Sequence, residues 1–301
     1  MDKYVCYIND NNLGDVLLNA SFKDITTLGV GGSISLLYYP NSTLSFITFY
    51  RFFIKNKDYP LLCIGGGSNI LASSKNYNGI VVCFKNISEI CIKNNNVIVS
   101  SGYDVRILST VLKYLNLKGG EYLNSLPATV GGIITMNASC FGYKTSDIVK
   151  RCLCIDENGL LKWYKNEELK FAYRNSIIKS SELIVLKAEL VFEKGTIKEI
   201  KEITERLRRK RADNQPLNLK NAGSVFKNND NYTVWKMIDS LGFRGMNIND
   251  ACVSNKHCNF IVNKNKASSD DIYELVCMIK DAVKEKYNIE LECEWTLINF
   301  S

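Results

Sequence analysis

A run of three glycines constrains the folding of this chain more than any other stretch. The run Gly65-Gly66-Gly67 follows a short apolar segment, and the polar pair Ser68-Asn69 comes directly after it. Without Cβ atoms the backbone can turn tightly and direct several N–H groups at one anion. No Gly-Lys-Ser/Thr follows and the G-x-G-x-x-G spacing is missing, which excludes a P-loop and a dinucleotide fingerprint. A phosphate cradle and a glycine-rich turn between buried strands explain this stretch equally well.

The composition is that of an ordinary globular protein. Its 301 residues suffice for two or three compact units, with 46% hydrophobic and 23% charged residues. Eleven scattered cysteines without a C-x-x-C pair favour reduced thiols over disulfides or a zinc site. The N-terminus lacks the layout of a signal peptide, and no apolar run reaches the roughly 18 residues of a spanning helix. We therefore expect a cytoplasmic protein without a membrane partner.

Charge narrows the choice of ligand. The net charge of +7 favours anionic ligands such as nucleotides. The basic run 208–211 is short, has no interleaved aromatic residues and lies at the expected end of a helix, where it complements the helix dipole. His257 is the only histidine, so histidine-based metal sites and Ser-His-Asp triads lack candidates. We expect a small-molecule ligand, no metal and no nucleic acid.

The apolar pattern predicts an α+β chain without the regular βα alternation of a doubly wound fold. A change of composition after Gly195 indicates a domain boundary near 195–200. Alternation over 291–298 would place Glu292 and Glu294 on the same face of a strand. The predicted strands are 34–39, 80–84, 97–100 and 183–192, and an Asn-rich turn is expected between the strands 80–84 and 97–100. A hairpin is predicted at Asn158-Gly159. The predicted helices are 43–55, 105–115 with Asp104 as its cap, 196 to the basic run, 233–241, and one from Ser269.

Several other segments place polar groups where packing alone would not require them. A second glycine-rich passage, 126–138, combines a proline, a hydroxyl and an asparagine in an apolar setting. Arg174 follows two aromatic residues, and Ser224 stands beside a glycine. Taken singly, these last two are better explained as a surface arginine and a helix-capping serine, and the acidic pair at 292–294 as a solvated strand face.

Taken in order along the chain, these segments resemble the UDP-N-acetylenolpyruvoylglucosamine reductase (MurB) family. The resemblance runs from about Thr26 to Ile298, and the order and spacing of the motifs make it specific. The segments that carry it are Gly65-Gly-Gly-Ser-Asn69, Leu126-Pro-Ala-Thr-Val-Gly-Gly132, Met136-Asn-Ala138, Tyr173-Arg-Asn-Ser176, Gln215-Pro216, Ala222-Gly-Ser-Val-Phe-Lys-Asn228, Lys256-His-Cys-Asn-Phe-Ile-Val-Asn263 and Leu291-Glu-Cys-Glu294.

The resemblance implies a vanillyl-alcohol-oxidase/PCMH-type FAD-binding fold of two α+β subdomains plus a C-terminal α+β substrate domain. The expected limits are 1–72 for the first subdomain (joined by the C-terminal strand 290–301), 73–195 for the second, and 196–289 for the substrate domain. It also implies noncovalent FAD, NADPH as co-substrate, and reduction of an enolpyruvyl UDP-sugar to UDP-N-acetylmuramate for peptidoglycan. We expect the enzyme to be a monomer.

The resemblance also assigns site residues one by one. Arg174 and Glu294 would stabilise the enolate that forms on the substrate, and Ser224 would donate a proton to it. Glu294 would have to carry a proton in order to donate a hydrogen bond rather than repel this charge. The expected substrate-binding residues are Tyr173, Lys227, Asn228 and His257, the last in a structural or substrate-orienting role. The expected cofactor-binding residues are Gly65, Gly66, Gly67, Ser68, Asn69, Pro127, Thr129, Gly131, Gly132 and Asn137.

The chain departs from the family pattern in a few places and leaves two alternatives open. Ala128 and Thr129 stand where the family more often has Gly and Ser. No extended insertion lies between Arg174 and Ser224, so the chain resembles the second type, which lacks the tyrosine-lid insertion. The first alternative is another oxidase or dehydrogenase on the same flavin fold, with flavin tethered through Cys140. The second is a non-catalytic binder of nucleotides or nucleic acid.

Overall fold

A computed structural model describes residues 1–229 and 231–300 of the chain, whose contacts divide it into two compact units. Asp230 and Ser301, the last residue of the expected strand 290–301, lie outside the described residues. Within the glycine run, Gly66 ends one segment of unit 1 and Gly67 begins one of unit 2. The expected three-domain limits stay a prediction. Unit 1 consists of Met1–Asn19, Ser35–Gly66 and Asn78–Arg209, and unit 2 of Ala20–Ile34, Gly67–Tyr77 and Lys210–Ser301.

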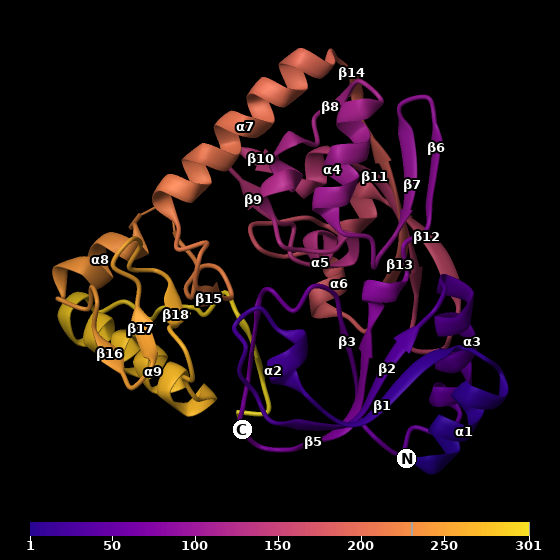
Figure 1. Ribbon diagram of the computed structural model, residues 1–301, viewed down its shortest axis with the longest axis horizontal. Helices are drawn as coiled ribbons and strands as arrows, with labels where there is room; N and C mark the ends of the chain where they lie inside the picture. Colours follow the sequence, from indigo (N-terminus) through magenta and orange to yellow (C-terminus); the bar gives the residue numbers. More distant parts are fainter. Residues whose placement is uncertain (230, 301) are drawn as a thin grey trace. The chain divides into compact units, whose positions relative to one another are not determined.

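A four-stranded sheet lies mainly in unit 1. In spatial order its strands are β1 (Gly14–Ser21), β2 (Ser33–Pro40), β5 (Tyr77–Cys83) and β3 (Leu61–Ile64). Figure 1 shows helices α1 (Asp2–Asp10) and α3 (Thr43–Ile54) next to β1 and β2. The fully buried ring of Tyr4 on α1 meets Phe49 and Phe53 of α3, with centroids 6.4 Å and 6.0 Å away. The two helices and the sheet therefore share one aromatic core.

The predicted strand at 34–39 and helix at 43–55 are confirmed by β2 and α3. Ser42 caps α3 by accepting a hydrogen bond from the Ser45 N–H (3.1 Å), which satisfies one of the donors that the first turn leaves open. Pro40 ends β2, as expected of a residue without an N–H for the ladder.

A five-stranded antiparallel sheet forms the second part of unit 1. In spatial order its strands are β12 (Leu161–Lys165), β11 (Val149–Ile155), β13 (Ile184–Val191), β7 (Asn96–Ser100) and β6 (Ile90–Lys93). Helices α4 (Val105–Tyr114) and α5 (Val130–Thr135) share a buried core with it through Leu108, Ile134 and Leu190. The hairpin at Asn158-Gly159, the strand at 183–192 and the Asp104 cap of α4 are confirmed.

The Asn-rich turn was assigned to the wrong pair of strands. β5 and β7 belong to different sheets, and β6 lies between them in the sequence. The turn instead joins β6 to β7, with Asn94 in the left-handed region (φ +57°) that asparagine tolerates. The sequence shows turn chemistry locally, whereas the pairing partner of a strand depends on tertiary packing.

The remaining elements of unit 1 are short, apart from one long helix whose last residues belong to unit 2. Helix α7 (Ile197–Asn214) continues beyond the basic run at which the sequence placed its end, and it stops before Pro216 as expected. Thr196 Oγ1 accepts a hydrogen bond from the Glu199 N–H (3.2 Å), which is one half of the predicted capping box. The short elements are α6 (Ile177–Ser180), β8 (Leu117–Lys118) paired with β14 (Glu193–Lys194), β9 (Ser139–Cys140) paired with β10 (Tyr143–Lys144), and the 3₁₀ turns η1 (Phe84–Asn86), η2 (Glu121–Ser125), η3 (Thr145–Asp147) and η4 (Asn166–Leu169).

Unit 2 has its own sheet and core. Its antiparallel strands are, in order, β15 (Lys220–Asn221), β18 (Ile261–Asn263), β17 (Ala251–Val253) and β16 (Asn247–Ile248). Helix α9 (Ser269–Tyr287) lies along this sheet and buries Ile272, Leu275 and Ile279 (Figure 1). The predicted helices at 233–241 and from Ser269 are confirmed by α8 (Val234–Ser240) and α9. The other elements are α2 (Phe22–Ile25) and the parallel pair β4 (Ile70–Ala72) and β19 (Thr296–Ile298).

The acidic segment near the C-terminus differs from its prediction. Glu292 is exposed, whereas Glu294 is buried, so the two carboxylates have different surroundings, and their shared face stays a prediction. The segment runs alongside residues 225–227 as an isolated bridge, and only 296–298 forms a strand. Glu292 forms an ion pair with Lys227 on the exposed side. Tertiary pairing, which the sequence pattern does not contain, therefore sets the surroundings of each carboxylate.

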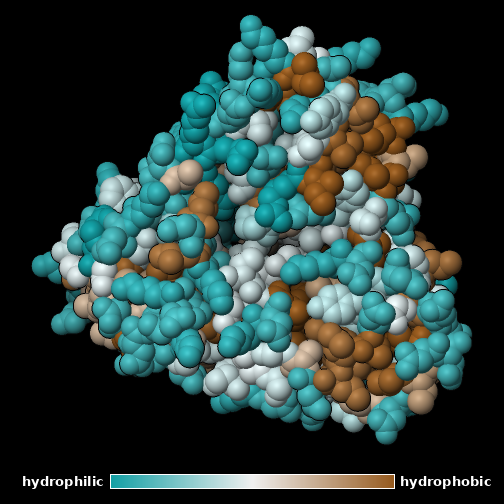
Figure 2. Space-filling model, viewed as in Figure 1, coloured by the Kyte–Doolittle hydropathy of each residue, from teal (hydrophilic) through white to brown (hydrophobic). Residues whose placement is uncertain are grey.

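Hydrophobic areas interrupt a mostly hydrophilic surface on the face shown in Figure 2. Among the residues that the structure describes, no helix is both long and apolar enough to cross a membrane. The same residues contain no cluster of three or more His, Cys, Asp or Glu side chains suited to a metal ion. None of the eleven cysteines, all of which lie within the described residues, forms a disulfide bond.

Candidate active site

Two glycine-rich loops come together in unit 1. A Cβ atom added at Gly65 would lie 2.1 Å from Thr129 Oγ1, and one added at Gly66 would lie 3.0 Å from the carbonyl oxygen of Pro127. Real Cβ contacts are essentially never closer than 3.0 Å, so any other residue at 65 would force the Thr129 side chain or the loops to move. The structure thus places the first residues of one predicted cofactor-binding loop, Gly65 and Gly66, against Pro127 and Thr129 of the other.

The second loop leads directly into α5. Thr129 caps this helix by accepting a hydrogen bond from the Gly132 N–H (3.4 Å), and the Gly131 N–H donates to the Ser101 carbonyl (2.8 Å). A Cβ atom at Gly131 would lie 2.9 Å from Ser101 Cβ, whereas one at Gly132 would make only an ordinary contact of 3.5 Å. Packing within the protein therefore accounts for glycine at 131 and leaves glycine at 132 unexplained.

A tight turn presents Arg174. Ala172 and Asn175 exchange backbone hydrogen bonds (3.0 Å and 3.2 Å), and Arg174 has a φ of +53°. Its Nη1 donates to Ser139 Oγ (2.9 Å), and the guanidinium lies 5.4 Å from the ring centroid of the exposed Tyr173. A non-glycine residue at positive φ is strained, and such strain persists only where the surroundings hold it.

The side chain of Asn137 hydrogen-bonds the backbone of this turn. It is buried, its Nδ2 donates to the Ala172 carbonyl (3.0 Å), and its Oδ1 accepts from the Ser146 N–H (3.0 Å). Both ends of the amide are therefore occupied by the protein. This contact explains the residue structurally, and a direct role toward the cofactor stays a prediction.

We expect Asn137→Ala to destabilise the protein by about 1–3 kcal/mol, because it removes the two hydrogen bonds that this buried amide makes to the backbone of Ala172 and Ser146. Urea unfolding measures the effect. Asn175→Ala in the same turn is the control, since Asn175 is exposed and joins the turn through its backbone. Equal stability of the two variants would contradict this account of Asn137.

The rest of the first glycine loop belongs to unit 2. Gly67 has a φ of +64°, and a Cβ atom there would lie 2.1 Å from the Ile25 carbonyl, so both conformation and space require glycine. Asn69 Nδ2 donates to the backbone carbonyl of Glu294 (3.0 Å), and Asn69 accepts from the Thr296 N–H (2.9 Å). Asn69 thus contacts the segment of the predicted catalytic glutamate, and Ser68 beside it is half-buried.

Two predicted catalytic segments run side by side in unit 2. The Glu294 N–H donates to the Val225 carbonyl (2.7 Å), which places Ser224 one residue from a direct partner of Glu294. Gly223, with a φ of +77°, turns the chain into this segment. Glu294 is buried, and Ser224 is half-buried. Among the described residues the Ser224 hydroxyl makes no hydrogen bond, so it is free to interact with a ligand.

Lys227 and Asn228 already have partners within unit 2. Lys227 Nζ pairs with Glu292, and its side chain is only 17% exposed. Asn228 Oδ1 accepts from the Val234 N–H (3.2 Å) at the start of α8. Their expected contacts with substrate stay predictions, and a ligand would have to share or replace these bonds.

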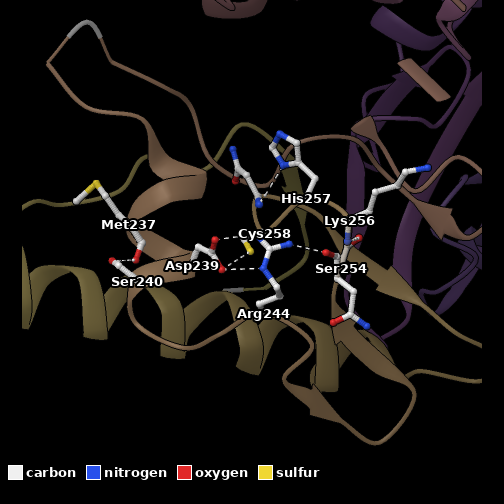
Figure 3. A network of polar contacts seen from close by, with 10 residues as sticks. Met237, Asp239, Ser240, Arg244, Ser254, Lys256, His257 and Cys258 are labelled. Atoms are coloured by element: carbon white, nitrogen blue, oxygen red, sulfur yellow. Dashed lines mark hydrogen bonds and ion pairs between the residues drawn. The ribbon is translucent and has the colours of Figure 1, made fainter. Parts of the chain in front are cut away.

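His257 lies on a loop that connects β17 to β18 (Figure 3). Its Nδ1 accepts a hydrogen bond from the Asn259 N–H (3.2 Å), and the rings of Trp235 and Phe260 lie 6.2 Å and 5.0 Å away. Burial lowers the pKa of His257 below its usual value, and the positive charge of Arg244 lowers it further. A neutral imidazole with the hydrogen on Nε2 fits these contacts, which favours a structural or orienting role over a role as an acid.

The lowered pKa of His257 predicts that acid destabilises the fold. As the pH falls below the ordinary histidine pKa of about 6.5, the unfolded chain binds a proton before the folded protein does. The free energy of unfolding should therefore decrease until the pH reaches the lower pKa of the folded state. Urea unfolding across pH 5–7 tests this, with His257→Gln as a control that lacks the effect. Because the chain has one histidine, its NMR titration is unambiguous, and a pKa at or above the ordinary value would contradict the prediction.

Sequence reasoning assigned no role to Asn259, although it lies inside the quoted motif at 256–263. It is 1% exposed, and its side chain bonds both backbone groups of Phe226 (3.0 Å and 2.8 Å). A polar residue within the apolar run Cys258-Asn-Phe-Ile-Val262 was the available signal.

Comparison with known proteins identifies the family. Residues 215–298 match the model of the UDP-N-acetylenolpyruvoylglucosamine reductase C-terminal domain, and residues 19–164 match an FAD binding domain. The UDP-N-acetylenolpyruvoylglucosamine reductase of Caldanaerobacter subterraneus subsp. tengcongensis is 33% identical over 285 residues, which cover 95% of this chain and 94% of that protein. The enzyme of the same name from Alkaliphilus oremlandii is 36% identical over 284 residues, covering 94% and 93%. The chain belongs to the UDP-N-acetylenolpyruvoylglucosamine reductase family.

Solved structures confirm the predicted fold of this family member. The crystal structure of UDP-N-acetylenolpyruvylglucosamine reductase (MurB) from Thermus caldophilus matches with a TM-score of 0.79 and 28% identity, covering 95% of this chain and 98% of that one. Alkyldihydroxyacetonephosphate synthase matches with a TM-score of 0.51 and 15% identity over 64% of this chain and 40% of that one, which is a likeness of fold alone. Both glycine-rich loops lie within the FAD-binding match at 19–164.

Proposed function

We propose that this chain is the NADPH-dependent reductase that converts UDP-N-acetylenolpyruvoylglucosamine to UDP-N-acetylmuramate during synthesis of peptidoglycan precursors. Membership of the family over 95% of the chain supports the reaction. The observation that carries the proposal is the hydrogen bond from Glu294 N–H to the Val225 carbonyl (2.7 Å). It brings a half-buried serine hydroxyl and a buried carboxyl group onto neighbouring segments, as proton delivery requires.

The glycine-rich loops fit a noncovalent FAD. The close approach of Gly65 and Gly66 to Thr129 and Pro127 leaves backbone free of side chains, and Gly132 is not required by internal packing. Such backbone suits a bound pyrophosphate, which accepts hydrogen bonds from N–H groups. FAD, when bound, supplies the means of passing a hydride from NADPH to the enolpyruvyl group. The residues proposed to hold FAD are Gly65, Gly66, Gly67, Ser68, Asn69, Pro127, Thr129, Gly131, Gly132 and Asn137.

The chain's own catalytic residues would act on the charge and the proton. Hydride addition to the enolpyruvyl double bond shifts negative charge onto the substrate carboxylate, and stabilising such charge is a large part of catalysis. Arg174 offers a permanently charged, fork-shaped donor for that carboxylate. Glu294, in its protonated form, would donate a second hydrogen bond, and Ser224 would give its proton to the substrate carbon.

The remaining proposed features concern binding and context. Tyr173, Lys227, Asn228 and His257 would contact or orient the UDP-sugar. The limits 1–72, 73–195 and 196–289, with the strand 290–301 joined to the first region, remain the proposed domain arrangement. We propose a cytoplasmic monomer that binds neither nucleic acid nor a membrane.

A flavin titration tests the reaction. The purified protein should be yellow, release its flavin on mild acid denaturation, and bleach when NADPH is added without air. Colour should return when the enolpyruvyl UDP-sugar is added, with formation of UDP-N-acetylmuramate. Bleached protein that stays colourless with this substrate would overturn the proposed function. Flavin that stays with the denatured chain would instead favour the tethered alternative through Cys140.

A further inference from the structure

The side chain of Asn259 completes the hydrogen bonding of a short bridge in unit 2. Residues 225–227 and 292–294 bond through Lys227 N–H to the Glu292 carbonyl (2.9 Å) and Glu294 N–H to the Val225 carbonyl (2.7 Å). In an antiparallel pair, the residue between two such bonds turns its own N–H and C=O to the other side. Here that residue is Phe226, which is fully buried, so its backbone needs another partner.

Asn259 supplies that partner with its amide group. Its Oδ1 accepts from the Phe226 N–H (3.0 Å), and its Nδ2 donates to the Phe226 carbonyl (2.8 Å). Its backbone carbonyl accepts from the Val225 N–H (2.9 Å). One residue thus fixes two consecutive positions of the segment directly after Ser224, on the side opposite Glu294.

The loop that carries Asn259 is tied to α8 through the contact between Cys258 and Asp239 (Figure 3). The guanidinium of Arg244 binds both carboxylate oxygens of Asp239 (2.7 Å each) and donates to the Asn255 carbonyl. The Cys258 thiol donates to Asp239 Oδ1 (3.6 Å), and His257 Nδ1 accepts from the Asn259 N–H (3.2 Å). The loop 254–260 is therefore anchored on both sides of the amide that bonds Phe226.

We infer that Asn259 is a positioning residue that holds Ser224 and Glu294 in register for proton delivery; the inference rests on the proposed function. A serine is a weak acid, so its transfer of a proton depends on accurate placement. The Asn259 amide prevents the 224–227 segment from sliding along 292–294, because any shift would leave the buried backbone of Phe226 without partners.

Asn259→Asp tests the inference with almost no change in size. The aspartate keeps an acceptor for the Phe226 N–H but places an oxygen against the Phe226 carbonyl. Bleaching by NADPH and affinity for the enolpyruvyl UDP-sugar should stay unchanged, while the substrate-dependent return of colour slows by about 10- to 100-fold. The solvent deuterium isotope effect on that step should rise. Asn265→Asp, at an exposed asparagine of unit 2, is the matched control.

A double variant separates positioning from general damage. If Asn259 acts through Ser224, adding Asn259→Asp to Ser224→Ala should slow the return of colour no further. A further loss of the same size as in the single variant, or a wild-type rate in Asn259→Asp alone, would overturn the inference. Wild-type protein that never regains colour with the substrate would instead overturn the proposed function.

Arg244→Ala provides the test if Asn259→Asp does not fold. Arg244 is partly exposed and acts on the loop rather than on the core, so the variant should fold. We expect a smaller slowing of the return of colour, again with unchanged bleaching by NADPH and again absent from the Ser224→Ala background. A wild-type rate in Arg244→Ala would then overturn the inference.

Discussion

Ser224→Ala should leave reduction by NADPH unchanged and slow the substrate-dependent return of flavin colour by about 10²- to 10⁴-fold, the usual contribution of a positioned acid. The hydroxyl removed is the one that we propose to give its proton to the substrate carbon. Its loss should cost little stability, because it makes no hydrogen bond within the described residues. Stopped-flow absorbance under anaerobic conditions separates the two half-reactions.

Ser240→Ala is the control for this variant. Ser240 lies in the same unit on α8, and its hydroxyl bonds the Met237 carbonyl (2.8 Å) and the Tyr287 hydroxyl (2.6 Å), neither of which belongs to the 224–227 segment. It should behave as wild type in both half-reactions. If Ser224→Ala lost both half-reactions together, or neither, Ser224 would not be the proton donor.

Gly65→Ala should abolish stable flavin binding and yield a colourless protein. The added Cβ would lie 2.1 Å from Thr129 Oγ1, far inside contact distance, so either the Thr129 side chain would have to rotate out of its position at the cap of α5 or the two glycine-rich loops would have to separate. Overpacking of this kind usually destabilises a protein by about 1–3 kcal/mol, which urea unfolding of the flavin-free protein can measure. The absorbance ratio of flavin to protein measures the retained cofactor.

Thr129→Ala should partly rescue the Gly65→Ala variant. The next nearest atom to the added Cβ is Thr129 Cβ at 3.4 Å, so removing Oγ1 relieves the clash. Thr129→Ala alone should cost about 0.5–2 kcal/mol through loss of the α5 cap. The double variant should therefore be more stable than the sum of the two single effects predicts. Additive effects would show that the loops do not meet at this contact.

Much of the fold follows from local signals in the sequence. The apolar spacing predicts helix α3, and apolar spacing together with the cap Asp104 predicts α4, because capping depends on residues within one turn. The hairpin at Asn158-Gly159 is also predicted from a local signal, since both residues suit a tight turn between two antiparallel strands. The family resemblance supplied what no local signal could, namely the cofactor and the reaction.

The errors and omissions arise where contacts between distant parts of the chain decide the burial and the partners of a residue. Alternation predicts a strand over 291–298, but only 296–298 forms one, and Glu292 and Glu294 beside residues 225–227 differ in burial. Asn259 carries no local signal for its partner, because the Phe226 backbone that it bonds is 33 residues away in the sequence. The sequence alone does not show why residue 65 is a glycine. The reason becomes visible only in the structure, where Thr129 lies against it.

The assembly of unit 2 from three separate stretches sets the order in which the chain can mature on the ribosome. Its core combines Leu28, Val30 and Leu71 from the early stretches with residues of α8 and α9. The early side chains emerge long before their partners are synthesised, and the closing contacts span most of the chain, which is slow. Helices α8 and α9 must therefore leave the ribosome before this core can close, and until then Leu28, Val30 and Leu71 are surfaces on which chaperones or aggregation can act.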